Sequence, residues 1–571
     1  MQITRRLGAT VFLVALLAWL PAAENAPGSA TAAFDLVLAG GTVFDGSGQP
    51  PRVADVGIRN GRIEAVGDLS VDRTSRRLDV RGLAVAPGFI NMLSWATESL
   101  LADGRSLSDI CQGVTLEVMG EGDSMGPLTP DMKAETLRNQ SGFKYDMPWN
   151  TLGEYLEYLE RRGVSTNVAS FVGASTVREG VVGLDNRPPT PEELGQMQAL
   201  VARAMEEGAL GVGAALIYTP GCFASTGELT ALARTAAKYD GMFICHLRSE
   251  AGQFLEGVGE IVRIARDSGA RAEIYHLKAA GAANWPKLEA AVQIIEEARA
   301  SGVRLTADMY AYTAGATGLD ACMPPWVREG GYERWRERLL DPAIRLRVMR
   351  EMVQPGAGWE NFFVAAGSAE HIRFVGFKNP ALRPLIGRTL AEVAAGRGQS
   401  PEETVIDLVV EDGSRVEAIY FLMSEDNVRR QIRLPWVSFC SDAESAPAEG
   451  PQLQSSVHPR AYGNFARLLG RYVREERLIP LEEAVRRLTA LPAENLRLPD
   501  RGRIRPGFWA DLAVFDPARV RDLATYEKPR QLAEGMVHVF VNGVQVLADG
   551  RHTGATPGRF VRGTGYRPPP K

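Results

Sequence analysis

Two histidines occupy matching positions in the sequence and could bind a metal ion together. Residues 241–250 form a short apolar run that reaches His246, and residues 271–280 repeat the pattern around His276. The helix-like segment 254–266 lies between them, and a strand–helix–strand order makes neighbouring strands parallel. Both imidazoles would then emerge at the carboxyl edge of a parallel sheet, where such folds place their chemistry. The pattern favours a metal site; two buried histidines bonded to the backbone are the structural alternative.

The composition is that of a globular protein with more than one domain. The chain has 571 residues, 45% hydrophobic and 23% charged, and this length exceeds what one compact core usually holds. The net charge of -5 provides no basic surplus for binding nucleic acid. The five cysteines are sparse and odd in number, so we predict core packing and no disulfide framework.

The first 32 residues have the layout of a secretory signal peptide. Arg5 and Arg6 precede an apolar run at 9–20, and a stretch of small residues follows it. The run is short for a membrane span, so we expect no stable span after processing; an uncleaved anchor is the alternative. We therefore predict that residues 1–32 are a signal peptide and that the protein is exported, either periplasmic or secreted.

Both ends of the chain contain strand patterns joined by hairpin turns. Asn60-Gly61 lies between alternating apolar runs near the start, and Asn542-Gly543 does so near the end. Neither small set of strands could bury a face alone. We therefore predict one β-sandwich domain built from residues 34–86 and 500–562, with a large domain inserted between them.

The middle of the chain alternates strand candidates with helical segments. Thr190 and Ser400 are each followed by Pro-Glu-Glu, which is typical of helix starts. Eight strand candidates at this spacing predict an α/β fold, a (β/α)8 TIM-like barrel over residues 87–499. A doubly wound open sheet is the alternative. Residues 311–435 are too long for a loop, so we predict a helical insert before the last barrel strand, which could cover the barrel opening as a lid. The strand candidates are 84–92, 114–119, 167–172, 210–216, 242–247, 272–277, 304–310 and 436–440.

Several short motifs follow one another along the chain in a defined order. They are Pro87-Gly-Phe-Ile-Asn91, Gly113-Val-Thr, His246-Leu-Arg, His276-Leu-Lys, Ser441-Asp442, His458-Pro-Arg460 and Ala510-Asp-Leu. In this order they resemble the amidohydrolase superfamily and, more narrowly, the N-acyl-D-amino-acid deacylases (D-aminoacylases). The resemblance extends from about residue 34 to about residue 562. It implies a metal-bearing barrel, a β domain from both chain ends, and a small N-acyl amino acid or amide as substrate.

The chain departs from the pattern of that family at the first barrel strand. The family reads Pro-Gly-Phe-Ile-Asp-x-His-x-His, whereas this chain has Asn91, Leu93 and Trp95 at the aspartate and the two histidine positions. The first-strand half of a two-metal site is therefore absent. We expect Leu93 to fill the vacated space, whereas Trp95 could reach the substrate.

The family cysteine ligand after the second strand is missing as well. Residues 119–123 read Met-Gly-Glu-Gly-Asp, so Glu121 or Asp123 would face the site, and Glu121 is the closer match. A carboxylate can replace a thiolate as a zinc ligand, although a plain turn carboxylate is the alternative. We predict one zinc ion per chain, held by Glu121, His246 and His276, with a fourth position open for water.

The resemblance also implies the residues that perform the reaction. Zinc lowers the pKa of a bound water towards about 7. Asp442 would take the proton of this water and pass it to the leaving amine, with a strand-end cap as its structural alternative. The family favours Lys278, with Tyr310 or Tyr312, for binding the substrate.

Further residues could contact the carboxylate or the carbonyl of the substrate. Strand alternation places Arg248 on the side of His246, although it could instead pair with a carboxylate. Tyr218 could donate to the developing oxyanion, with ordinary packing as the alternative. Arg460 and His458 complete the set of predicted substrate contacts.

These observations predict a metal-dependent hydrolase of non-peptide C–N bonds that deacylates N-acyl-D-amino acids or related amides. One alternative is another amidohydrolase, similar to dihydroorotase, hydantoinase or a dipeptidase. Another is a metal-free scaffold without catalysis, because three family ligands are absent. The sequence contains no P-loop. Substrate side chain, chirality and acyl group stay open, and an oligomer is possible.

Overall fold

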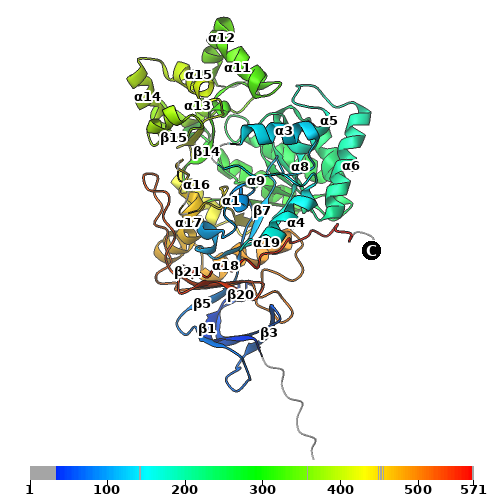
Figure 1. The fold of residues 1–571 in the computed structure, drawn as a ribbon, viewed down its shortest axis with the longest axis vertical. Coiled ribbons are helices and arrows are strands. Elements are labelled where there is room, and N and C mark those ends of the chain that lie inside the picture. The colour runs from blue at the N-terminus through cyan, green and yellow to red at the C-terminus, as the bar shows by residue number, and fades with distance from the viewer. Residues whose placement is uncertain are drawn as a thin grey trace, which may run out of the picture.

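The computed structural model describes residues 34–140, 143–355, 358–447, 449, 453 and 455–568. The predicted signal peptide, residues 1–32, lies outside the described residues. Along the long axis of the molecule, a β domain lies at one end, a barrel in the middle and an insert at the other end (Figure 1). Within the described ranges, no helix combines the length and apolar character needed to cross a membrane.

The middle layer is a closed barrel of eight parallel strands. Two of the elements, β8 and β9, are halves of one barrel strand that is interrupted at Phe171. The backbone N–H of Met92 donates to the carbonyl of Phe439 at 3.4 Å, and a bridge between Ser94 and Ala443 closes the ring. This closure confirms the predicted (β/α)8 barrel and excludes the open sheet. In order, the barrel strands are β6 (Phe89–Asn91), β7 (Val114–Met119), β8 (Asn167–Ser170) with β9 (Val172–Gly173), β10 (Gly211–Ala215), β11 (Met242–His246), β12 (Arg271–Ile274), β13 (Leu305–Met309) and β17 (Val437–Phe439).

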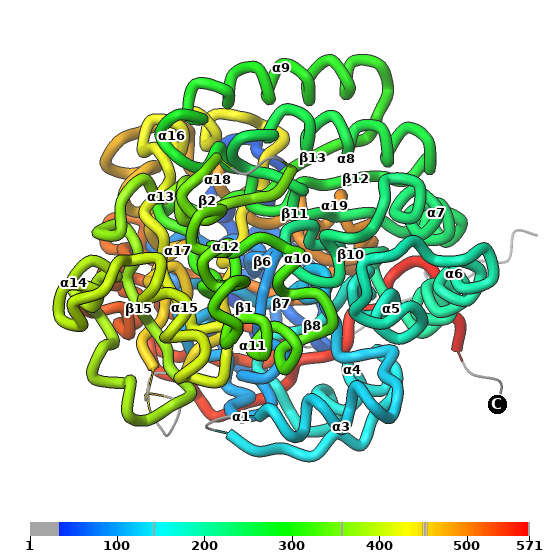
Figure 2. Tube along the Cα trace, turned by 90° about the horizontal axis from the view of Figure 1, so that it is seen from above, coloured from blue at the N-terminus to red at the C-terminus, as the bar shows by residue number. Residues whose placement is uncertain are grey.

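Helices surround the barrel, and the long helices α6 (Pro191–Glu207) and α8 (Phe254–Ser268) bury an apolar face. The predicted helix start at Thr190 is a capping box with Glu193, and α6 begins there. In α8 the buried residues recur at helical spacing, which places a continuous apolar stripe against the barrel. Seen from above, α6, α7 (Thr226–Ala237), α8 and α9 (Lys287–Ala300) follow one another around the strands (Figure 2).

The two ends of the chain join in a single nine-stranded sheet. Its order is β21-β20-β19-β18-β5-β1-β2-β3, with β4 paired to β1, so strands from both termini are neighbours. Alternation along β18 (Leu512–Phe515) turns Leu512 and Val514 into the core of the β domain, and Ala513 and Phe515 towards the barrel. The remaining strands are β1 (Leu36–Val43), β2 (Arg52–Arg59), β3 (Arg62–Gly67), β4 (Arg77–Asp79), β5 (Ala84–Pro87), β19 (Met536–Val541), β20 (Val544–Ala548) and β21 (Arg551–His552).

Both predicted Asn-Gly hairpins are present. Asn60 and Gly61 have φ angles of 51° and 76°, and Asn542 and Gly543 have 50° and 79°. Positive φ at both central residues matches the twist of the flanking strands. The predicted strand 84–92 divides at Gly88 into β5 and β6, because the chain passes there from the β domain into the barrel. A Cβ at Gly88 would lie 2.1 Å from the Thr115 side chain, so only glycine fits this crossing.

The insert lies at the carboxyl end of the barrel strands, opposite the β domain (Figure 1). It contains the predicted helices, among them α11 (Tyr332–Leu340), α12 (Pro342–Met352) and α15 (Pro401–Asp412). It also contains a small antiparallel sheet that the sequence did not reveal, ordered β14-β16-β15, with bounds Gly315–Gly318, Glu417–Tyr420 and Ile372–Gly376.

Candidate metal centre

The three predicted ligands converge on one buried point. His246 is the last residue of β11, His276 follows β12 by two residues, and Glu121 follows β7 by two. The two imidazole centroids lie 4.6 Å apart, and His276 Nε2 lies 2.8 Å from Glu121 Oε1. The potential ligand atoms of all three residues lie within 4.8 Å of one another, and each residue is 3% exposed. This donor set suits zinc, which binds imidazole nitrogen and carboxylate oxygen in compact sites.

Neighbouring groups orient both imidazoles. His246 Nδ1 lies 2.9 Å from the carbonyl of Leu247, which leaves Nε2 for a metal ion. His276 Nδ1 lies 3.0 Å from Glu250 Oε1, and its Nε2 faces Glu121. The backbone of His276 has a φ of 34°, and its N–H donates to Asp308 Oδ1 at 2.7 Å. Lys278 Nζ also lies 2.7 Å from His276 Nδ1. Partners of this kind hold the ring of a metal ligand in place.

Charges within the site favour ionised carboxylates. Burial alone would raise the pKa of Glu121, but His276, His246 and Lys278 outweigh it and lower that pKa. Burial and Lys278 lower the pKa of His276, whereas Glu250, Glu121 and Asp442 raise it to about 10 overall. A proton and a metal ion therefore compete for this imidazole.

The candidate base Asp442 follows β17 and is held from two sides. Its backbone has a φ of 48°, and its N–H donates to the carbonyl of Leu93 at 3.0 Å. Trp95 donates its indole N–H to Oδ1 at 3.2 Å, and Arg460 forms an ion pair with Oδ2 at 2.8 Å. The guanidinium of Arg460 also lies over the ring of Tyr310, 4.5 Å from its centroid.

Comparison with known proteins decides the family. The model of the family described as "Amidohydrolase family" matches residues 77–547. The chain belongs to the amidohydrolase family. This amidohydrolase is 34% identical to a D-aminoacylase of Alcaligenes xylosoxydans xylosoxydans over 535 residues, which cover 93% of this chain and 98% of the relative.

Two solved structures resemble this amidohydrolase over nearly their whole length. An N-acyl-D-glutamate deacylase of Bordetella bronchiseptica, in complex with zinc and a phosphonate inhibitor, is 31% identical with a TM-score of 0.76, covering 93% of this chain and 100% of that one. A D-aminoacylase structure described in terms of its binuclear metal centre is 34% identical with a TM-score of 0.76. The match covers 92% of this chain and 99% of that one. The predicted family resemblance is thereby confirmed.

Lys278, Tyr310 and Tyr218 line the same site in this amidohydrolase. Lys278 Nζ donates to Glu250 Oε1 at 2.6 Å and lies 5.6 Å from the Tyr310 ring centroid. The hydroxyl of Tyr310 is buried and has no hydrogen-bond partner among the described residues. Tyr218 lies edge-on to His246, with ring centroids 5.6 Å apart, and its hydroxyl donates to Thr317 of the insert at 2.9 Å.

Three other predicted substrate contacts already have partners within the protein. Arg248 binds Glu260 of α8 at 2.9 Å and the carbonyls of Cys222 and Ala224, so it has the structural role that was its alternative, pairing with a carboxylate. The hydroxyl of Tyr312 donates to Asp522 at 3.2 Å. His458 Nε2 lies 2.9 Å from the carbonyl of Ala314, and its Nδ1 accepts the backbone N–H of Arg460 at 3.0 Å.

Glu250 is the main residue of the site that sequence reasoning did not select. It touches both Lys278 and His276, and its side chain is 1% exposed. Burial opposes its ionisation, but Lys278, His246 and His276 together hold the pKa of Glu250 well below its usual range. The sequence did offer one indication of this role, since Glu250 lies four residues after His246. The loop after a barrel strand can return a side chain to the site.

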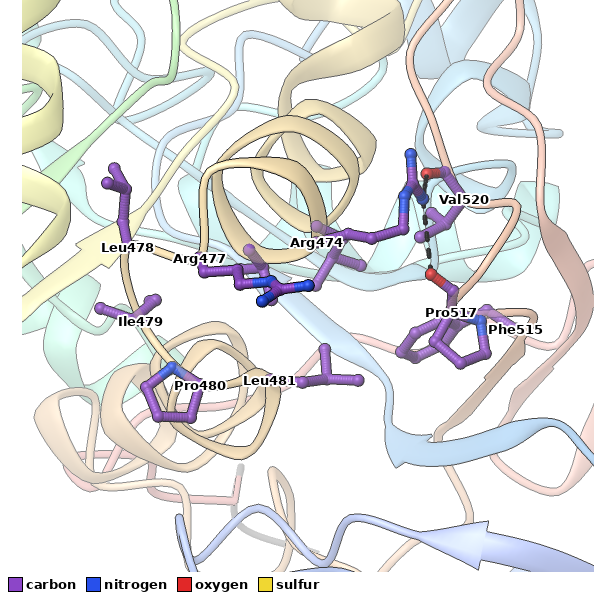
Figure 3. A pocket seen from close by; sticks show the side chains of 11 residues that line it. Arg474, Arg477, Leu478, Ile479, Pro480, Leu481, Phe515, Pro517 and Val520 are labelled. Atoms are coloured by element: carbon purple, nitrogen blue, oxygen red, sulfur yellow. Dashed lines mark hydrogen bonds between the residues drawn. The ribbon is translucent and has the colours of Figure 1, made fainter.

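A cavity of about 470 Å³ lies away from this centre, between the end of the helical segment 468–475 and the loop after β18 (Figure 3). Its lining is apolar except for Arg474 and Arg477, and Arg474 donates to the carbonyls of Pro517 and Val520. None of the predicted site residues lines this cavity. The cavity is therefore separate from the metal centre.

Proposed function

We propose that this chain is a zinc-dependent deacylase of N-acyl-D-amino acids that holds one metal ion per subunit. The observation that carries the proposal is the convergence of Glu121, His246 and His276 on one buried point. The charge of Asp442 acts on His276 at this point. The D-aminoacylase and deacylase relatives supply the substrate class.

The chemistry divides between the metal ion and the side chains around it. A bound zinc ion would activate a water molecule and polarise the substrate carbonyl. Three protein ligands leave one position open, which is the arrangement of catalytic rather than structural zinc. Asp442 would accept the proton of the attacking water on a carboxylate oxygen and return it to the leaving nitrogen.

Lys278, Arg460 and Tyr310 would bind the polar ends of the substrate. The two cations lie near the proposed ligands, and both are more than 90% buried, so their attraction for a substrate carboxylate is weakly screened. The buried Tyr310 hydroxyl has a free donor among the described residues, and a substrate oxygen would satisfy it. Arg248, Tyr312 and His458 are weaker candidates, because their side-chain polar atoms already have partners within the protein. Arg460, by contrast, keeps its Nε without a hydrogen-bond partner among the described residues.

Metal analysis and a substrate screen test the proposal together. We expect about one zinc ion per purified chain, lost in the variant His246→Ala/His276→Ala, and turnover of N-acyl-D-amino acids in a library that also holds the L-enantiomers and cyclic amides. Turnover of cyclic amides alone would support the hydantoinase-like alternative. A chain without any bound metal or turnover would support the non-catalytic scaffold.

A further inference from the structure

Trp95 lies where the barrel closes between β6 and β17. Its backbone N–H donates to the carbonyl of Ala443 at 2.9 Å, and Ser94 forms a bridge with the same residue. Its indole N–H points at Asp442 Oδ1, 3.2 Å away. The donor and the carboxylate are thus carried by two adjacent, hydrogen-bonded segments of backbone, which leaves little freedom for either to move.

The remaining groups around Asp442 complete its fixation. Leu93 is fully buried and accepts the backbone N–H of Asp442. Arg460, in the first turn of α17 (Arg460–Arg467), pairs with Oδ2 at 2.8 Å. Each carboxylate oxygen of Asp442 therefore has a partner of its own, a neutral N–H donor at Oδ1 and a cation at Oδ2.

The family pattern has histidines where this chain has Leu93 and Trp95. The D-aminoacylase structure with a binuclear metal centre is described in terms of one-metal activation and second-metal attenuation. A second cation near Asp442 would need nitrogen or oxygen ligands, and neither an isobutyl group nor an indole supplies one. A guanidinium and an indole N–H can still neutralise and orient a carboxylate.

We propose that Trp95, together with Arg460, takes the place of the second metal ion. Trp95 is then a positioning residue that holds Asp442 towards the single zinc ion, and its ring closes the second metal position. This inference rests on the proposed function. It predicts that the enzyme binds one zinc ion at saturation. It also predicts that excess zinc does not lower the activity through a second site.

The first test removes only the indole N–H. The variant Trp95→Phe keeps a ring but leaves Asp442 Oδ1 without its donor. Loss of a hydrogen bond to a charged group should lower kcat of Trp95→Phe by about 10-fold to 100-fold. KM and zinc content should stay unchanged. The control Trp285→Phe removes an indole hydrogen bond to the carbonyl of Leu422 elsewhere and should leave kcat unchanged. An unchanged kcat in Trp95→Phe, or a rise in KM alone, would overturn the positioning role.

The second test uses the wild-type chain and needs no activity. In equilibrium dialysis against excess zinc, the wild-type chain should bind one zinc ion at saturation. The variant His246→Ala/His276→Ala measures zinc that binds elsewhere, and this amount is subtracted. The variant Leu93→His/Trp95→His should gain a second zinc ion. A second specific ion in the wild type would overturn the proposal, even if Trp95→Phe fails to fold. A wild type that binds one zinc ion but hydrolyses none of the library overturns the proposed function instead.

Discussion

His276 Nε2 lies 2.8 Å from Glu121 Oε1, although 155 residues separate the two in the chain. Their strands, β12 and β7, are not neighbours, since β8 with β9, β10 and β11 lie between them. The contact therefore crosses the barrel interior. Glu121 completes the set of metal ligands although it lies far from both histidines in the sequence. Its role as a ligand is therefore the first to test.

Replacement of Glu121 should weaken zinc binding directly. We expect Glu121→Gln to lower zinc affinity by at least about 100-fold in a chelator competition assay, because an amide oxygen carries no charge for the metal. Glu121→Cys should keep the metal, since a thiolate is also a zinc ligand. Asp123→Asn is the matched control, because Asp123 lies two residues away and is not among the three residues whose ligand atoms converge. Loss of zinc from Asp123→Asn with retention in Glu121→Gln would reassign the ligand.

Glu250 should control both the metal and the stability of the site. Glu250→Gln removes the charge that faces His276 Nδ1 and Lys278 Nζ, so we expect zinc affinity to fall by about 10-fold to 100-fold. It also leaves Lys278 as a buried cation without its partner, which costs about 3–5 kcal/mol in comparable cases. Isothermal titration and thermal melting measure the two effects. Glu256→Gln, on the exposed side of α8, should change neither.

Stability should fall as pH rises because of Glu273. This side chain is fully buried in β12; burial, with the charge of Asp308, raises its pKa to about 8. In the unfolded chain the pKa of Glu273 is expected to be about 4.3. Between about pH 4.3 and about pH 8 the folded state therefore holds a proton that the unfolded state has lost. The free energy of unfolding decreases over this range by about 1.4 kcal/mol per pH unit.

Melting curves at pH 5 and pH 8 test this titration. Glu273→Gln should reduce the difference between the two melting temperatures, since the amide cannot ionise. The exposed Glu296→Gln should leave the difference as in the wild type. An unchanged pH dependence in Glu273→Gln would assign the effect to another group.

Export should remove the beginning of the chain. We propose that residues 1–32 act as a cleaved signal peptide, so the mature protein from a bacterial culture should start near residue 33 and appear in the periplasmic fraction or the medium. Amino-terminal sequencing and fractionation measure this. Deletion of the apolar run 9–20 should retain the protein inside the cell. A full-length chain in the membrane fraction would favour the uncleaved anchor.

The sequence by itself determined the architecture and most of the donor set. Strand and helix periodicity predicted the barrel, the Asn-Gly hairpins predicted strands at both ends, and the repeated apolar run ending in histidine placed His246 and His276 together. These signals are local. A residue near the carboxyl end of a parallel strand lies at the carboxyl edge of the sheet, independently of the rest of the chain.

Only the tertiary structure decided where the side chains beyond the strand ends point. Alternation placed Arg248 beside His246, but β11 ends at His246, and past that residue a period of two no longer applies; Arg248 binds Glu260 instead. Trp95 meets Asp442 because the first and last barrel strands adjoin, 347 residues apart in sequence. Such contacts depend on barrel closure and loop conformation, which no local pattern encodes.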